Sequence, residues 1–336
     1  MLRHPVMSLL AFARVVVKDL QSYSNCNAMV LLESLQERTM ANPHILATHS
    51  GAFHADDVFA CAFLDMFFPE PVEIIRTRDR DTIESADITV DVGYVYDPAE
   101  MRFDHHQPDY TGDRSSVGMV LDWIEDHGLI EPFLANWFRE NLVNELDDSD
   151  CNGTPHAMSL LIWNMNTTVV MPTERDHEVA FNTALSNAKT VVRTTLKSGI
   201  AAMEQQTLLE TIVSEQANSD ILIFPHYMRE LVWRVSKAHL TAKFVVWQAG
   251  HDAWMVQCVP PIEDRQAQRL PFPEQVRGLR DHDLEKAVKV DLGAAEKPES
   301  VFIHRDGWVG GAATKAGALA LADFALNPVL PKTVVL

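Results

Sequence analysis

A segment of nine residues, HSGAFHADD, concentrates side chains that bind divalent metal ions. It contains His49, His54 and Asp56, and it joins a short apolar run to a pattern with helical spacing. Imidazole and carboxylate groups suit borderline or hard divalent ions such as Mn²⁺. The point where a strand leads into a helix is also where open parallel sheets bind ligands and anions. The segment therefore predicts a metal site, and solvated loop histidines are the alternative interpretation.

Two later segments add ligand types of the same kind. Asp91 closes the apolar run ITVDV, where a carboxylate is costly to bury unless it is paired or bound to a metal. Asp104, His105 and His106 follow one another in FDHHQ, and neighbouring side chains of an extended segment point to opposite sides. One histidine can therefore bind a metal while the next faces a substrate, with Asp104 orienting a ring. Plain polar turns are the competing interpretation of both segments.

The acidic segment ELDDSD provides the last ligand candidate. It can be aligned so that either Asp147 or Asp150 is the ligand, and Asp147 is the one we choose. Taken alone, this segment reads as an acidic helix end. Together with the other segments, within about 100 residues, it completes a set that two ions ~3.5–4 Å apart could share. Such a pair needs a bridging carboxylate, and Asp91 is the candidate for that bridge.

These motifs, in this order, resemble the series found in the DHH phosphoesterase superfamily. More narrowly, the chain resembles the MYG family, the melanocyte-proliferating-gene-type exonucleases, through further stretches such as RTRD, SSVGMVL, RLPFPEQVRGLRD and FIHRDGWVGGAATKAGAL. The similarity runs from about residue 44 to 326. It implies a bilobed α/β fold of the DHH type, with a mostly parallel sheet in the N-terminal domain and a smaller α/β C-terminal domain that holds the substrate.

The resemblance also implies an activity and a role for each candidate. The activity is 3′-to-5′ exonuclease cleavage of RNA, single-stranded DNA being a second substrate, with two divalent ions, Mn²⁺ or alternatively Mg²⁺. The residues implied are His49, His54 and Asp91 for one ion, Asp56, Asp91, His105 and Asp147 for the other, His106 facing the scissile phosphate, and Asp104 supporting the histidines.

A locally basic stretch supplies candidates for binding the substrate. The formal net charge of −19 argues against broad binding of duplex nucleic acid. Residues 227–280 nevertheless hold eight basic against five acidic side chains. Three tryptophans of this region, Trp233, Trp247 and Trp254, could stack bases, although their strand context favours core packing. The candidates for contacting a short single strand are Arg277, Arg280, His304, Arg305, Lys315 and the backbone at Gly310 and Gly311.

Apolar patterns predict the framework that positions these residues. Short apolar runs at 44–48, 72–76 and 88–92 are typical of strands, and helical spacing marks 57–67 and 115–124 as helices. This alternation predicts a mostly parallel sheet with helices on both faces. Further along the chain we expect strands at 231–235, 242–247, 253–259 and 301–304, followed by a Gly-Gly turn that opens a helix at 316–326.

The same patterns predict the domain organisation. We expect a metal-binding catalytic domain at 44–171, a helical connector at 172–218 and a substrate-binding domain at 219–330. Residues 1–43 are interpreted as an N-terminal extension, ordered or not. Four widely spaced cysteines are typical of reduced thiols, and no apolar run approaches the ~20 residues needed to cross a bilayer. We therefore expect a cytoplasmic protein, or one of the nucleus or mitochondria in a eukaryote.

Two other functions fit the same metal ligands. One is a hydrolase of a small phosphate such as pyrophosphate or a short nucleotide, because the same ions suit both kinds of substrate. The other is a non-catalytic metal-binding module that has kept the motifs. The nearly complete ligand set argues against that module, because unpaired buried carboxylates would be costly. The oligomeric state is not fixed by the sequence.

Overall fold

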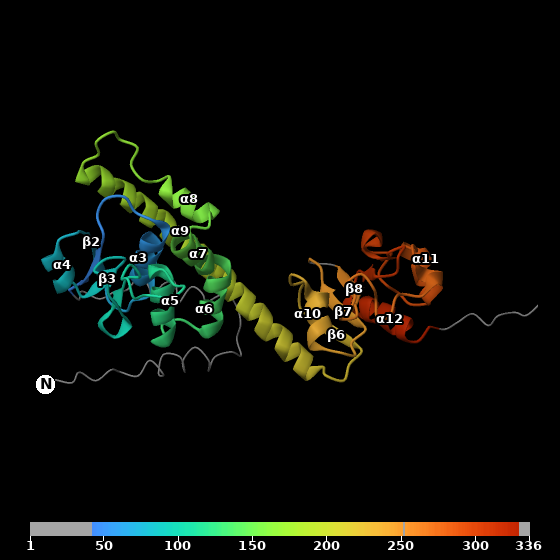
Figure 1. Ribbon diagram of the computed structural model, residues 1–336. Helices are drawn as coiled ribbons and strands as arrows, with labels where there is room; N and C mark the ends of the chain where they lie inside the picture. The colour runs from blue at the N-terminus through green and yellow to red at the C-terminus, as the bar shows by residue number, and fades with distance from the viewer. Residues whose placement is uncertain (1–41, 251–252, 329–336) are drawn as a thin grey trace, which may run out of the picture. The chain divides into compact units, whose positions relative to one another are not determined.

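The computed structural model describes residues 42–250 and 253–328. Most of the predicted N-terminal extension lies outside these residues. The chain divides into two compact units, which we call unit 1 (Met1–Met203) and unit 2 (Glu204–Leu336). Helix α9 (Glu174–Glu215) contains the boundary between them (Figure 1). This long helix corresponds to the strand-poor stretch from which we predicted a helical connector.

The sheet of unit 1 is mostly parallel, as predicted. Its strand order is β2-β1-β3-β5-β4, where β2, β1, β3 and β5 run parallel and β4 pairs antiparallel with β5 at the edge. The apolar runs HILAT and ITV form the central strands because their side chains are covered by the core. The strands are β1 (His44–Thr48), β2 (Val72–Arg76), β3 (Ile88–Val90), β4 (Tyr96–Asp97) and β5 (Arg102–Phe103).

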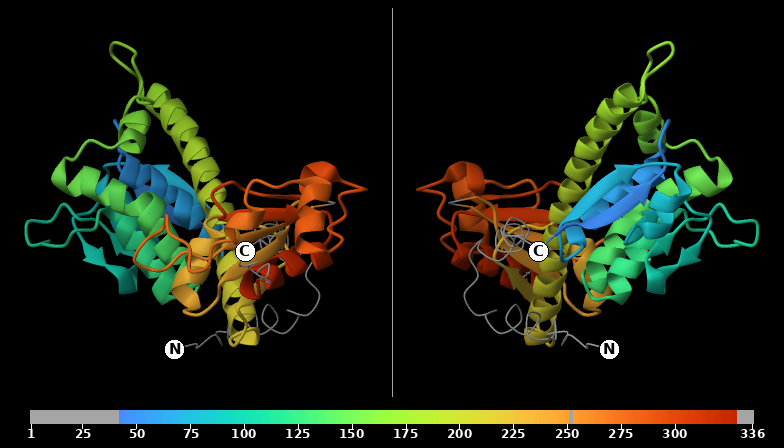
Figure 2. Two further views of the ribbon diagram at one scale, coloured as in Figure 1. Left: turned by 90° about the vertical axis from the view of Figure 1, so that its right-hand side faces the viewer. Right: turned by 90° about the vertical axis from the view of Figure 1, so that its left-hand side faces the viewer.

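Helices of unit 1 pack against this sheet and against each other, as the views in Figure 2 show. Helix α3 is buried along almost its whole length, which explains why its sequence ADDVFACAFLDMF is mostly apolar. Its closest helical neighbour is α5, and Phe59, Phe63 and Val117 are fully buried among them. The helices are α3 (Ala55–Phe67), α4 (Arg80–Ser85), α5 (Ser116–Asp126), α6 (Pro132–Phe138), α7 (Asn144–Asn152) and α8 (Ala157–Trp163), with the short helical segments η1 (Pro98–Glu100) and η2 (Arg139–Val143).

Unit 2 is a second α/β body with a mainly antiparallel sheet. Its strand order is β6-β7-β8-β10-β9, and β6 runs parallel to β7 while the remaining neighbours are antiparallel. The strands are β6 (Ile221–Phe224), β7 (Phe244–Gln248), β8 (Trp254–Cys258), β9 (Phe302–Ile303) and β10 (Val309–Ala312). The helices are α10 (Leu231–Ala238), α11 (Asp281–Val288) and α12 (Lys315–Leu326), with the short turns η3 (Glu274–Val276) and η4 (Pro298–Ser300).

Two predictions for unit 2 are wrong. The strand predicted at 231–235 is the helix α10, because Leu231 and Val235, four residues apart, form one buried face. Gly310 and Gly311 lie inside β10 rather than in a turn before α12. A Cβ atom on Gly310 would collide with Ile303 Cδ1 and lie 3.0 Å from Phe302 O. These glycines therefore let β9 and β10 pack closely, and their buried position does not favour a phosphate contact through their backbone.

Among the described residues, no helix combines the length and the apolar character that crossing a bilayer requires.

Candidate metal centre

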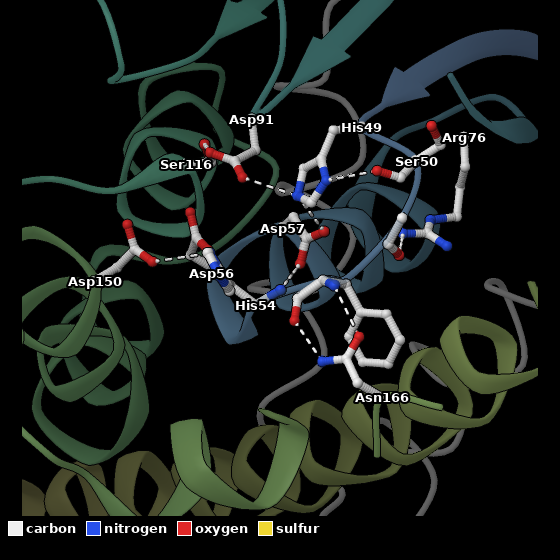
Figure 3. Close-up of polar contacts among 12 residues, drawn as sticks. His49, Ser50, His54, Asp56, Asp57, Arg76, Asp91, Ser116, Asp150 and Asn166 are labelled. Atoms are coloured by element: carbon white, nitrogen blue, oxygen red, sulfur yellow. Dashed lines mark hydrogen bonds and ion pairs between the residues drawn. The ribbon is translucent and has the colours of Figure 1, made fainter. Parts of the chain in front are cut away.

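The ligand candidates of unit 1 gather where parallel strands end. Carboxyl ends of neighbouring parallel strands meet at one edge of a sheet, and ligands bind there in open α/β folds. His49 follows β1, Asp91 follows β3, and His105 lies two residues beyond β5. The first turn of α3 adds Asp56 and Asp57 to the same edge. Figure 3 shows most of these side chains pointing toward one another.

One group of ligand atoms is formed by His49, Asp57 and Asp91. His49 Nε2 lies 3.0 Å from Asp57 Oδ2 and 3.3 Å from Asp91 Oδ2. All three residues are buried. Burial would lower the pKa of His49, but the two carboxylates raise it to about 10. The two carboxylates therefore favour a positive charge at His49 Nε2.

A second group surrounds His105. Its Nε2 lies 3.0 Å from Asp150 Oδ2, 3.7 Å from Asp56 Oδ2 and 3.5 Å from Asp91 Oδ1. Its other ring nitrogen, Nδ1, lies 3.9 Å from Cys151 Sγ. His54 lies beside these residues, with its Nδ1 3.6 Å from Asp150 Oδ1, and it forms a set of possible ligands with Asp56 and Asp150. We call His54, Asp56, Asp91, His105 and Asp150 the second group.

Asp91 lies between the two groups. Its Oδ2 faces His49 and its Oδ1 faces His105. Ser116 Oγ donates to Asp91 Oδ1 over 3.1 Å, which helps to fix the carboxylate. The backbone of Asp91 is left-handed (φ 55°), a conformation that few residues other than glycine adopt without strain. One oxygen for each group is the geometry expected of a bridging ligand.

Several buried atoms of these groups lack ordinary hydrogen bonds. Both carboxylate oxygens of Asp56 have no hydrogen-bond partner among the described residues, whereas Asp57 Oδ2 and His105 Nε2 meet their ion-pair partners His49 and Asp150 at 3.0 Å. Burial and neighbouring carboxylates raise the pKa of Asp56, and burial likewise raises that of Asp57. A buried carboxylate without a partner is strongly unfavourable unless a cation or a proton compensates its charge. The nitrogen and oxygen donors therefore fit divalent metal ions such as Mn²⁺.

Asp104 and His106 lie beside the second group, and His106 also forms a set of possible metal ligands with Asp91 and His105, its Nδ1 lying 3.4 Å from Asp91 Oδ1. His106 Nδ1 lies 2.9 Å from Asp104 Oδ1, which also accepts the backbone N–H of His106 over 3.0 Å. Asp104 Oδ2 accepts the backbone N–H of Tyr94 over 2.6 Å. Asp104 is buried, whereas the His106 side chain is 48% exposed. Asp104 thus helps to orient the His106 ring.

The structure does not bring Asp147, our choice within the acidic segment, into either group, whereas the alternative Asp150 lies in the second one. Asp147 Oδ1 accepts hydrogen bonds from Ser115 N (3.0 Å), Ser115 Oγ (2.8 Å) and Gly118 N (3.2 Å). Its Oδ2 accepts one from Arg114 Nη1 over 3.1 Å. These bonds fix the start of α5 against α7. Asp150, one turn further along α7, is the residue that reaches His54 and His105.

Two arginines next to the first group were not predicted as site residues. They belong to the segment RTRD, which carried the family resemblance without an assigned role. Arg76 donates to Gly51 O over 2.8 Å, and its guanidinium lies 4.4 Å from the ring centre of Phe181. Arg78 donates to Ser50 O over 3.1 Å and lies 3.5 Å from His49 Nδ1. Arg76 therefore fixes the loop between β1 and α3, which carries His49 and His54. The exposed Arg78 places a positive charge beside this loop.

The residues of unit 2 that we predicted to bind the substrate make contacts within that unit. Arg277 donates through Nε to Phe272 O over 2.8 Å, and the guanidinium of Arg280 lies 5.5 Å from the ring centre of Phe302. The rings of His304 and Trp308 are 5.3 Å apart. Lys315 Nζ lies 5.7 Å from the ring centre of Trp254. The Arg305 side chain is 85% exposed.

Comparison with known proteins identifies relatives along most of the chain. The model of the MYG1 exonuclease family, described as "Uncharacterised protein family (UPF0160)", matches residues 45–121 and 140–326. MYG1 exonuclease of Homo sapiens is 30% identical over 339 residues, covering 85% of this chain and 86% of the human protein. MYG1 protein of Chlamydia muridarum is 31% identical over 277 residues, covering 79% and 91% respectively.

A solved structure, that of exonuclease RecJ bound to manganese, aligns over 90% of this chain and 94% of the RecJ chain. The sequence identity is 13% and the TM-score is 0.25, a score too low to establish a shared fold. The family model and the relatives carry the assignment instead. On that basis, the chain belongs to the MYG1 exonuclease family.

Proposed function

We propose that this protein is a metal-dependent phosphodiesterase that removes nucleotides one at a time from the 3′ end of single-stranded RNA. The observation that carries the proposal is Asp91, whose two oxygens face separate histidine-carboxylate groups. Two metal ions sharing one carboxylate are a recurring arrangement for phosphodiester cleavage. The names of the human and bovine relatives, MYG1 exonuclease, support the class of reaction.

The ligand set that we propose differs from the one implied by the sequence. Asp150 takes the place of Asp147, Asp57 is added beside His49, and His54 moves from the ion of His49 to the other ion, because it lies with Asp56 and Asp150. When bound, the divalent ions supply Lewis-acid polarisation of the phosphodiester and of the attacking water. The set is His49, Asp57 and Asp91 for one ion and His54, Asp56, Asp91, His105 and Asp150 for the other.

His106 is our candidate for assisting the leaving group. The neighbouring Asp104 raises the pKa of His106 above its ordinary value, so the ring is protonated more readily. With Nδ1 held by Asp104, the other nitrogen can donate a hydrogen bond or a proton to the oxygen that leaves. Arg78 is our candidate for a contact with a phosphate oxygen, because its guanidinium lies beside His49 and is exposed.

The test is a time course with single-stranded RNA in Mn²⁺. RNA labelled at the 5′ end should give a descending ladder with the wild type, and RNA labelled at the 3′ end should release the labelled mononucleotide first. His105→Ala should remove both signals. His127→Ala is the matched control, because His127 lies in the same unit and contacts Trp123 O over 2.8 Å rather than any metal group.

Each outcome separates the proposal from its alternatives. Uncut RNA together with release of phosphate from pyrophosphate would replace it with a hydrolase of small phosphates. The absence of turnover and of Mn²⁺ binding would contradict the metal assignment altogether. Equal rates on RNA and on single-stranded DNA would keep the reaction but remove the preference for RNA.

A further inference from the structure

Trp163, the last residue of α8, places an aromatic ring beside the metal groups. Its ring centre lies 5.6 Å from that of His54, and the two planes make an angle of 36°. Trp163 is 50% exposed. The His54 ring in turn reaches Asp150, with Nδ1 and Oδ1 3.6 Å apart. A large aromatic side chain therefore meets solvent one ring away from the second ligand group.

Hydrogen bonds join the backbone at Trp163 to the loop that precedes α3. The side chain of Asn166 donates through Nδ2 to Phe53 O (2.9 Å) and to Trp163 O (3.1 Å). Its Oδ1 accepts the backbone N–H of Phe53 over 3.0 Å. Phe53 immediately precedes His54 in the chain, and Figure 3 shows Asn166 facing the backbone of this loop. The end of α8 and the loop that carries His54 are thus joined through one amide.

The surface around Trp163 is apolar as well as exposed. Leu160, three residues earlier on the same face of α8, is 59% exposed. Exposed apolar side chains that gather beside a polar site are typical of a binding surface. The tryptophans considered from the sequence are less available: Trp247 is 6% exposed, and Arg265 lies 4.8 Å from the ring centre of Trp233.

We propose that Trp163 is the platform on which the nucleobase next to the scissile phosphate stacks, so that the site recognises a nucleotide rather than a bare phosphate. This inference rests on the proposed function, because it takes the substrate phosphate to lie at the metal groups. A base lies one sugar away from its phosphate, so a phosphate near His54 brings the base within reach of the Trp163 ring. Stacking on an aromatic ring tolerates every base, which suits trimming of a strand without regard to sequence.

The test compares two ligands that differ only in the base. Binding of AMP and of ribose 5-phosphate is measured by calorimetry in Mn²⁺ for the wild type, Trp163→Ala, Trp163→Phe and Leu161→Ala. Leu161 is the matched control, since it lies on the same helix and is also 50% exposed. Trp163→Ala should lose about 5- to 150-fold in affinity for AMP, the equivalent of ~1–3 kcal/mol per stacked base.

The pattern across the variants decides the outcome. Affinity for ribose 5-phosphate should be the same in all of them, and Trp163→Phe should retain part of the affinity for AMP. Equal losses for both ligands would show that Trp163 only supports the fold of the site, and this result would overturn the inference. So would an unchanged affinity of Trp163→Ala for AMP, or a wild type that binds AMP no better than ribose 5-phosphate.

Measuring RNA cleavage by the wild type and the same variants distinguishes a failure of this inference from a failure of the proposed function. Wild-type cleavage of RNA with no difference between the ligands would reject stacking alone. A Trp163-dependent preference for AMP without any cleavage of RNA would reject the exonuclease activity and keep a nucleotide site.

Discussion

Exchanging the carboxylates of α7 one at a time tests the assignment of the metal ligands most directly. Asp147 is 2% exposed and accepts hydrogen bonds from Ser115, Gly118 and Arg114. Asparagine in its place would turn N–H donors toward these donors and leave at least one of them unsatisfied, at a cost of ~1–3 kcal/mol each. Burial raises the pKa of Asp147, so removal of its buried charge offsets part of this cost. We therefore expect Asp147→Asn to lower the free energy of unfolding by ~1–3 kcal/mol.

Asp150→Asn should instead weaken Mn²⁺ binding and leave the stability of the metal-free protein nearly unchanged. Asp150 lies 3.0 Å from His105 Nε2, and on our proposal its loss removes a metal ligand. Mn²⁺ affinity should fall at least ~10–100-fold, a loss that even residues supporting the ligands typically cause. Unfolding by urea in EDTA should give nearly the wild-type midpoint.

The assay measures both quantities on both variants, by urea unfolding without metal and by calorimetric titration with Mn²⁺. Asp147→Asn should bind Mn²⁺ with nearly wild-type affinity once allowance is made for the fraction folded. The assignment would be refuted if Asp147→Asn lost Mn²⁺ binding at unchanged stability while Asp150→Asn bound normally.

Three further predictions concern the same centre. Asp91→Asn should weaken the binding of both ions in a Mn²⁺ titration. Loss of only one ion would disprove the proposal that Asp91 bridges them. His106→Ala should lower kcat ~10²–10⁴-fold with unchanged Mn²⁺ affinity, as expected for proton transfer, and a loss of metal instead would make it a ligand. In EDTA, the raised pKa of His49 should stabilise the protein fully below pH ~6.5, and this contribution should be lost as the pH rises through about 10. Urea midpoints from pH 6 to 10 should therefore fall without metal and should change less in Mn²⁺, and a flat profile in EDTA would contradict the electrostatics.

The local sequence predicted the parts of the centre that are set by strand and helix ends. His49 and Asp91 could be found because each directly follows an apolar strand, and parallel strand ends converge. Asp147 and Asp150 could not be distinguished in this way, since both lie in one acidic run on one short helix. What separates them is the packing of α5 against α7, where Ser115 and Gly118 engage Asp147.

The errors in unit 2 have a similar origin. The segment from Leu231 is short and apolar, and such a run fits a strand as well as a buried helix. The Gly310-Gly311 pair is typical of a turn, yet its role is to admit the side chains of β9. Trp163 was overlooked because nothing in its local sequence indicates that α8 ends beside His54. Contacts between segments far apart in the chain decide all of these cases.

Gly118 of α5 lies directly against Asp147 of α7, beside the proposed metal site. A Cβ atom at this position would meet the carboxylate of Asp147, with one oxygen at 2.6 Å, and would lie 2.7 Å from Arg114 Cδ. Any side chain there would force the Asp147 carboxylate and the Arg114 side chain to shift, and Asp147 belongs to α7, the helix that carries Asp150 toward His105. The coordination distances of Mg²⁺ and the larger Ca²⁺ differ by a few tenths of an ångström, ~0.3–0.5 Å. We therefore expect Gly118, a residue outside the proposed ligand set, to influence the size of the ion that the proposed site binds.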